Sequence, residues 1–200
     1  MQAVAEVLIP ALTARFPEAP APDLDKLLDA AAECLARHGL AKTSVPDIAR
    51  ELGVAPSTVY RKVGTVEQAA WLIAARETRR FADRLPDLLD GVDGARRVTV
   101  AIAAAADATR AHPVCIKILR DDPDFVGRSL TRRMPIAVDG LAATFRPFLE
   151  AAMDLGIIRR HEPAWLADWI ARLYLIAVLA PPVGDVGASL DALLLPILEP

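Results

Sequence analysis

Cysteine, histidine and aromatic side chains are scarce in this sequence. Its 200 residues contain two cysteines and three histidines, and aromatic residues make up 5% of the chain. Because no secretory signal is evident, we interpret the two cysteines as reduced thiols rather than as a disulfide. The histidines lie far apart and outside any metalloprotease motif, and the sequence has no phosphate-binding glycine loop or nucleophile elbow. We therefore expect no enzyme activity, no cofactor and no metal site.

The sequence also lacks long hydrophobic runs and a strong net charge. No apolar run reaches the roughly 20 residues that cross a bilayer, so we expect a cytoplasmic protein without membrane contact. A net charge of −3 argues against general coating of nucleic acid, and any DNA contact must come from a local basic patch. Hydrophobic residues make up 54% of the chain, which is ample for one or two globular cores.

Two short helices around a tight turn are predicted between Thr43 and Val63. In the first helix, one face carries the apolar residues at helical spacing, and Ser44 with Asp47 approximates a capping box at its start. Gly53 follows the last apolar residue, where a left-handed backbone ends a helix at the least cost. The apolar face consists of Val45, Ile48, Ala49 and Leu52.

The second of these helices is predicted to begin at Pro56, because the fixed φ of proline suits the first helical position. With Val59 and Val63 facing inward, Ser57 and Arg61 point outward. The flanking residues are Thr58, Tyr60 and Lys62. Such a face is small, hydrogen-bonding and basic, as a helix that enters a major groove requires. The segment 37–62 has five basic side chains against two acidic ones, so the basic patch coincides with these helices.

Three segments follow one another in a characteristic order: L-L-D-A-A-A-E-C-L-A-R-H-G-L-A-K-T-S-V, then D-I-A-R-E-L-G-V, then S-T-V-Y. Together they resemble the DNA-binding domain of TetR-family transcriptional regulators. The resemblance covers about residues 23–71 and implies a list of DNA contacts. They are Thr43, Ser44, Ser57, Thr58, Tyr60, Arg61, Lys62 and the helix start at Thr65. Three positions depart from the family pattern: Ala55 replaces a serine cap, Val63 a phenylalanine, and Val66 a lysine that commonly reaches a phosphate.

The resemblance and the helical periodicity together predict an all-α protein in three parts. Residues 1–22 form an amino-terminal arm and linker, residues 23–66 a three-helix helix-turn-helix domain whose first helix is capped by Asp23, and residues 67–200 a helical ligand-binding and dimerisation domain. A long helix opens with a T-x-x-Q capping box at Thr65 and Gln68 and runs to about residue 90. It is the natural mechanical link between the last two parts.

By family resemblance, the larger carboxyl-terminal part holds a small molecule. Apolar side chains with few charges among them favour a lipophilic or aromatic ligand, although a plain helical core would use the same residues. The candidate lining residues are Ile102, Ile116, Leu119, Phe125, Met134, Val138, Phe145 and Trp169.

The segment 162–180 is predicted to be a helix that is apolar over most of its circumference, so it must be covered on two sides. The family resemblance implies a homodimer interface of four helices, built from this helix and a final helix at 190–198 of each subunit. A central core helix in a monomer is the alternative. The candidate interface residues are Trp165, Leu166, Ile170, Leu173, Tyr174, Ala177, Leu190 and Leu194.

The sequence therefore predicts a ligand-responsive transcriptional regulator, with repression as the expected mode. Its partners would be a second copy of the chain, a partly palindromic double-stranded operator and a small-molecule effector. A helical small-molecule-binding or adaptor protein that has lost DNA binding is the alternative, and the departures at Val63 and Val66 are its support.

Overall fold

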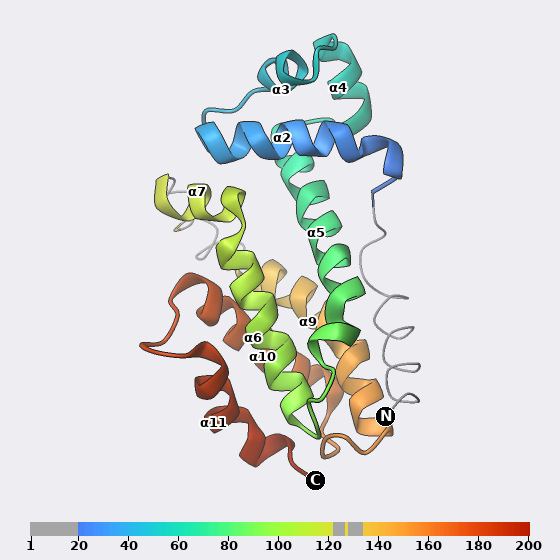
Figure 1. Ribbon diagram of the computed structural model, residues 1–200, viewed down its shortest axis with the longest axis vertical. Coiled ribbons are helices and arrows are strands. Elements are labelled where there is room, and N and C mark those ends of the chain that lie inside the picture. Colours follow the sequence, from blue (N-terminus) through green and yellow to red (C-terminus); the bar gives the residue numbers. More distant parts are fainter. Residues whose placement is uncertain (1–19, 122–126, 128–133) are drawn as a thin grey trace. The chain divides into compact units, whose positions relative to one another are not determined.

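The computed structural model describes residues 20–121, 127 and 134–200. Within these residues it contains nine α-helices, one short 3-10 helix and no β-strand, which confirms the predicted all-α fold (Figure 1). None of the described helices is long and apolar enough to cross a membrane. The predicted arm, apart from residues 20–22, and the candidate ligand residue Phe125 lie outside the described residues.

The described chain divides into two compact units. The amino-terminal unit comprises residues 20–80 and 111–121 with Gly127, and the carboxyl-terminal unit comprises residues 81–110 and 134–200. Helix α5 (Val66–Leu88) contributes residues to both units, and α7 (Pro113–Asp121) belongs to the amino-terminal unit. This division follows from contacts within the chain and does not test the predicted boundary at residue 66 between the DNA-binding domain and the ligand-binding domain, which remains a prediction.

The amino-terminal unit is built on η1 (Pro22–Leu24), α2 (Asp25–His38), α3 (Val45–Leu52) and α4 (Pro56–Val63). Figure 1 shows α3 and α4 stacked against α2. Each helix buries one apolar face in a common core, and α7 adds Val114 and Ile118 to that core beside α2. The largest fully buried side chains of this core are Leu28, Leu35, Ile48 and Val59.

The start of α2 differs from the prediction that Asp23 caps it. The N-cap residue is Leu24, without a side-chain hydrogen bond, because the 3-10 turn η1 places Asp23 one residue too early. The Asp23 carboxylate instead accepts a hydrogen bond from Lys62 Nζ at 2.9 Å. Asp23 therefore connects η1 to the end of α4.

Arg76 joins α5 to α2 through the interior of the amino-terminal unit. Its side chain is 8% exposed, and its Nη1 atom lies 2.8 Å from the Asp29 carboxylate. The same nitrogen donates to the Asp25 carbonyl oxygen at 3.2 Å, and Nε donates to Glu77 at 3.2 Å. A buried guanidinium with this many partners fixes the register between the two helices.

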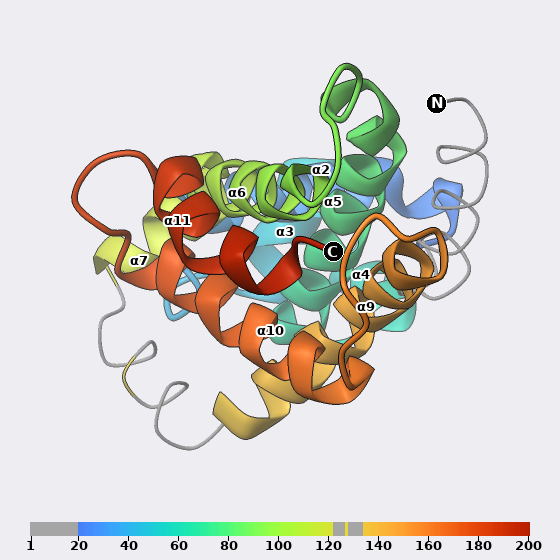
Figure 2. The ribbon, with the colours of Figure 1, turned by 90° about the horizontal axis from the view of Figure 1, so that it is seen from below.

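The carboxyl-terminal unit contains α6 (Arg96–Ala111), α9 (Met134–Asp154), α10 (Pro163–Leu179) and α11 (Val186–Leu198), with the end of α5. These helices surround one apolar core, and Figure 2 shows them from below. Two polar links cross this unit. Asp191 on α11 accepts hydrogen bonds from Thr99 and Arg96 on α6, and the Thr109 hydroxyl on α6 lies 2.7 Å from the Tyr174 hydroxyl on α10.

Candidate nucleic-acid interface

The start of α3 is fixed by the capping box that the sequence predicts. The Asp47 backbone N–H donates to Ser44 Oγ at 3.3 Å, and the Ser44 backbone N–H donates to the Asp47 carboxylate at 3.0 Å. The hydrogen bond from the Ser44 hydroxyl is the main reason that the pKa of Asp47 lies below its usual value. Gly53 ends α3 in the left-handed conformation, as predicted. The turn between α3 and α4 is therefore specified locally.

Thr43 is buried rather than presented at the surface. The residue is 8% exposed, and its hydroxyl donates to the Gly39 carbonyl oxygen at 2.7 Å. That bond ties the loop before α3 to the end of α2. The Thr43 hydroxyl thus has a structural role, whereas the neighbouring Ser44 is exposed.

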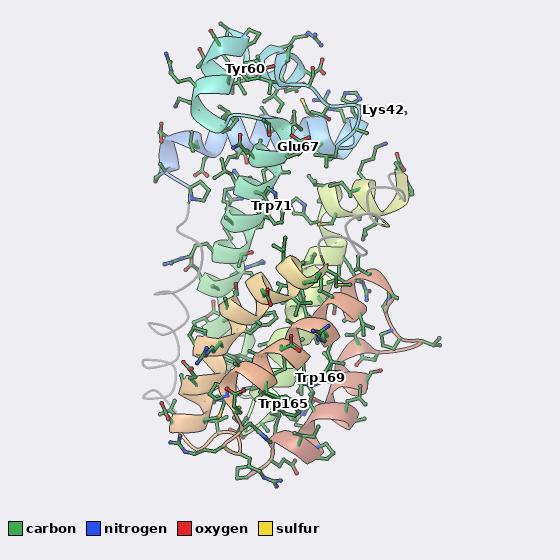
Figure 3. All side chains as sticks on the ribbon, turned by 180° about the vertical axis from the view of Figure 1, so that it is seen from behind. Lys42, Tyr60, Glu67, Trp71, Trp165 and Trp169 are labelled. Carbon is green, nitrogen blue, oxygen red and sulfur yellow. The ribbon has the colours of Figure 1, made fainter. Side chains whose placement is uncertain are left out.

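Helix α4 has the two-faced character of a recognition helix. Val59 and Val63 are 0% and 5% exposed, and the opposite face presents Ser57, Tyr60 and Arg61 to solvent. Tyr60 is 54% exposed, which is a large fraction for an aromatic side chain. Figure 3 labels Tyr60 on α4. Thr58 is half-buried, and Lys62 and Thr65 are exposed, so seven of the eight predicted contact residues reach the surface.

Most arginine and lysine side chains around α3 and α4 are already paired with carboxylates. Arg37 lies 2.5 Å from Glu51, Arg50 lies 3.0 Å from Asp47, and Lys62 lies 2.9 Å from Asp23. Within segment 37–62, which the structure describes throughout, Arg61 and Lys42 are the two arginine or lysine residues without a carboxylate at ion-pair distance. Lys42 was not among the predicted contacts. Lys42 lies in the loop before α3 (Figure 3), and its positive charge beside the predicted helices is the signal that could have added it to the candidate contacts.

The amino end of α4 lacks a side-chain cap, as the departure at Ala55 predicts. Ala55 is the N-cap residue and makes no side-chain hydrogen bond. We expect Ala55→Ser to raise the free energy of unfolding by about 1 kcal/mol, because a serine hydroxyl would accept from an otherwise unbonded N–H of the first turn. Chemical denaturation measures the change. Ala55→Val, which offers no acceptor, is the matched control, and an equal gain in that variant would contradict the capping explanation.

The start of α5 lies directly after the recognition helix. The Thr65 backbone N–H donates to Gln68 Oε1 at 2.8 Å and the Gln68 N–H donates to Thr65 Oγ1 at 3.2 Å, so the predicted T-x-x-Q box is confirmed. Val66 is 9% exposed and packs with Ala69 and Ile73. The valine that replaces the usual lysine therefore serves the core and leaves one fewer cation at this helix start.

Comparisons with known proteins agree with this geometry. Residues 27–62, which span most of α2 through α4, match the family model described as bacterial regulatory proteins, tetR family. Over 148 residues the chain is 27% identical to an uncharacterised HTH-type transcriptional regulator of Mycobacterium tuberculosis, covering 72% of this chain and 74% of that protein. The helix-turn-helix of this chain is that of the TetR family. Over most of its length the chain is similar to transcription regulators with a DNA-binding helix-turn-helix, as the sequence predicts.

A second HTH-type regulator of M. tuberculosis is 26% identical over 182 residues, which cover 88% of this chain and 85% of the relative. The solved structure of the TetR family repressor AlkX from Dietzia sp. has a TM-score of 0.61 at 17% identity, covering 88% of this chain and 95% of that chain. A TetR-family regulator from Pectobacterium atrosepticum has a TM-score of 0.59 at 18% identity, with 86% and 92% covered. These structures establish that the family fold extends over both units.

The predicted ligand residues fall in both units. Ile116 and Leu119 lie on α7 in the amino-terminal unit, whereas the other described candidates belong to the carboxyl-terminal unit. Ile102 and Val138 are core residues, and Trp169 is 51% exposed. Met134 and Phe145 are half-buried, and the Phe145 ring meets the Tyr174 ring edge-on at 5.6 Å. Because the Tyr174 hydroxyl also meets Thr109, a candidate ligand residue lies beside a pair of hydroxyl groups here.

A surface cavity of about 270 Å³ lies elsewhere in the carboxyl-terminal unit, and none of the predicted ligand residues lines it. Its walls come from the end of α9 and the segment that leads into α10. They are Glu150, Met153, Asp154, Arg160, His161 and Pro163. The described residues contain no cluster of side chains suited to hold a metal ion.

The predicted dimer residues divide into an inner and an outer set. Five of them are buried in the core of their own chain: Leu166, Ile170, Ala177, Leu190 and Leu194. Leu173 and Tyr174 are half-buried, and Trp165 is 48% exposed. The outer side of α10 and α11 is apolar as well, with Trp165, Trp169, Ile176, Leu193 and Ile197 each at least 39% exposed. We refer to these five residues as the outer apolar face.

Proposed function

We propose that this TetR-family protein is a homodimeric repressor that binds a partly palindromic operator and releases it when a lipophilic or aromatic effector binds. The outward face of α4 carries the proposal. Ser57, Tyr60 and Arg61 are exposed on it, while Val59 and Val63 anchor the opposite side in the core. A helix held in this way can enter a major groove without exposing its apolar residues.

We assign the exposed side chains two kinds of contact. Arg61, Ser57 and Thr58 are proposed to meet base edges, since arginine and hydroxyl side chains read bases in the major groove. Phosphates are proposed to be bound by Ser44, Tyr60, Lys62, the helix start at Thr65 and, in addition, Lys42. Thr43 is left with a structural role because its hydroxyl is bonded to the Gly39 carbonyl oxygen.

The outer apolar face supports the homodimer. Five large apolar side chains on α10 and α11 are exposed on one chain, and a second copy related by two-fold symmetry would cover them with the same surface. The five buried residues of the predicted interface then form the core beneath it. Two recognition helices in a symmetric dimer would read half-sites one or more helical turns apart.

Effector release requires a connection between the units, and the chain supplies two. Helix α5 is continuous from its capped start beside α4 to residues in the carboxyl-terminal core. Helix α7 follows α6 directly in sequence and packs on α2. An effector that binds the DNA-incompetent arrangement more tightly would shift the population by its differential affinity. The Thr109–Tyr174 hydroxyl pair beside Phe145 is a suitable polar anchor for one oxygen of an otherwise apolar effector.

The first experiment is a salt-dependent titration of the purified protein against the DNA that flanks its own gene. Salt-sensitive, sequence-selective binding by a dimer is the expected result. If a genome-wide selection also recovers no preferred duplex, the repressor proposal fails. The adaptor alternative would then stand, for which the pairing of most basic side chains with carboxylates is the favouring observation.

Arg61→Ala is expected to reduce the ratio of operator to non-specific affinity by about tenfold, since one good arginine–base contact contributes about 1–3 kcal/mol of discrimination. Titrations of both duplexes at one salt concentration measure the ratio. Arg159→Ala removes an equal charge from an exposed position of the carboxyl-terminal unit and is the matched control. An unchanged ratio in Arg61→Ala, or an equal loss in the control, would remove Arg61 from base recognition.

A further inference from the structure

One ion pair holds a proposed phosphate-binding side chain against the protein's own surface. Lys62, in the last turn of α4, donates to the Asp23 carboxylate at 2.9 Å, although the two residues lie 39 positions apart in the sequence. The two side chains are 35% and 67% exposed, so solvent and other ions can reach the pair. Lys62 is also the main reason that the pKa of Asp23 lies below its usual value.

Such a pair is easily opened. Exposed ion pairs contribute little to stability, because water screens the attraction and both side chains lose freedom. A backbone phosphate that is held at the right place by the rest of an interface can therefore replace the Asp23 carboxylate. In a complex where α4 makes few other contacts, no such contacts hold a phosphate beside Lys62, and the phosphate does not replace the carboxylate.

Asp23 presents to Lys62 the type of oxygen that a DNA backbone would present. Its carboxylate is acceptor-only, as a phosphate is. Since Arg37 and Arg50 are paired as well, opening the Lys62–Asp23 pair would add one cation to Arg61 and Lys42, the two in segment 37–62 that have no carboxylate at ion-pair distance.

We infer that Asp23 is a specificity-determining residue. Its carboxylate competes with DNA phosphate for Lys62 and prevents this lysine from contacting a phosphate in non-specific complexes. In the operator complex, where Arg61 and its neighbours seat α4 in the groove, Lys62 leaves Asp23 and contacts a phosphate. On other sequences the ion pair persists, and Lys62 contributes no phosphate contact. This inference rests on the proposed DNA-binding function.

The test is the salt dependence of binding by Asp23→Asn, which keeps the size of the side chain and removes its charge. On a scrambled duplex, we expect affinity to rise about two- to fivefold, which corresponds to the loss of an exposed ion pair. The slope of log affinity against log salt should steepen by about 0.9, the value of one added phosphate contact. On the selected operator duplex of equal length, the slope should not change, because Lys62 contacts a phosphate in both proteins.

Two further variants separate this inference from simpler explanations. Glu33→Gln removes the same charge from α2 at a side chain of matching exposure, 66%, and should leave the scrambled-duplex slope unchanged. In a Lys62→Met background, Asp23→Asn should have no effect on either slope. Circular dichroism and thermal unfolding confirm that each variant is folded.

The outcomes distinguish failure of this inference from failure of the proposed function. Suppose that the natural chain selects an operator. The inference is overturned if Asp23→Asn then leaves the scrambled-duplex slope unchanged, or if it weakens binding to both duplexes. Asp23 would in that case only connect η1 to α4. The inference is overturned as well if Glu33→Gln reproduces the effect. If the natural chain selects no duplex at any salt concentration, the proposed function fails first and this inference fails with it.

Discussion

Replacing Trp169 with glutamate is expected to split the proposed homodimer and to weaken binding to the proposed operator at least about 100-fold. Trp169 lies near the middle of α10, is 51% exposed, and shares the outer apolar face with Trp165 one turn earlier. Figure 3 shows both indole side chains on α10. In a two-fold interface each substitution acts twice, and each added carboxylate would have to leave water when the interface forms.

The loss of DNA affinity follows from the loss of the second subunit. A dimer binds two half-sites with two recognition helices, so that the second contact forms within the same complex. A monomer retains α4 and its folded unit but loses this advantage. We therefore expect helical content to stay unchanged while operator affinity falls toward the non-specific level.

Sedimentation equilibrium and DNA titration measure the two effects on the same preparation. Trp71→Glu is the control for oligomeric state, because Trp71 is also an exposed tryptophan, at 68%, but lies on α5 outside the outer apolar face. The dimer should survive in that variant. A Trp169→Glu protein that remains a dimer over the same concentration range would place the interface elsewhere.

The sequence predicts that α10 is covered on two sides, but it could not show which side faces the chain's own core. Leu166 and Ile170 face the chain's own core, while Trp165 and Trp169, their neighbours in the sequence, face outward. The helix is apolar on nearly every side, so periodicity gives no preference for either stripe. The inner stripe is covered by residues of α6, α9 and α11, and no spacing within α10 encodes that packing.

Local features of the helix-turn-helix were predictable because their partners lie within three or four residues. The Ser44–Asp47 and Thr65–Gln68 boxes are of this kind, and the structure contains both. The Lys62–Asp23 pair and the packing of α7 on α2 span 39 or more residues, and no sequence spacing encodes them. The candidate ligand residues share the same difficulty, since apolar residues look alike whether they line a pocket or fill a core.

Gly64→Ala is expected to lower the free energy of unfolding by about 2–4 kcal/mol and to weaken operator binding at the same time. Gly64 ends the recognition helix with φ 70° and ψ −114°, a conformation that side chains disfavour. A Cβ atom at this position would lie 1.9 Å from Gln68 Oε1. Gln68 can swing away, but its amide oxygen would then lose the hydrogen bond from the Thr65 N–H that opens α5.

Gly53→Ala is the matched control, because Gly53 ends α3 with a similar φ of 71° but an ordinary left-handed ψ of 32°. No atom lies within 4 Å of the Cβ that alanine would add there. Its cost should be about 1–2 kcal/mol, that of left-handed backbone alone. Chemical denaturation gives the two stabilities, and hydrogen exchange of α4 and α5 amides locates the change. If the two variants lose equal stability, the Gln68 cap contributes nothing, and the junction between recognition helix and α5 is held by the packing of Val63 and Val66 instead.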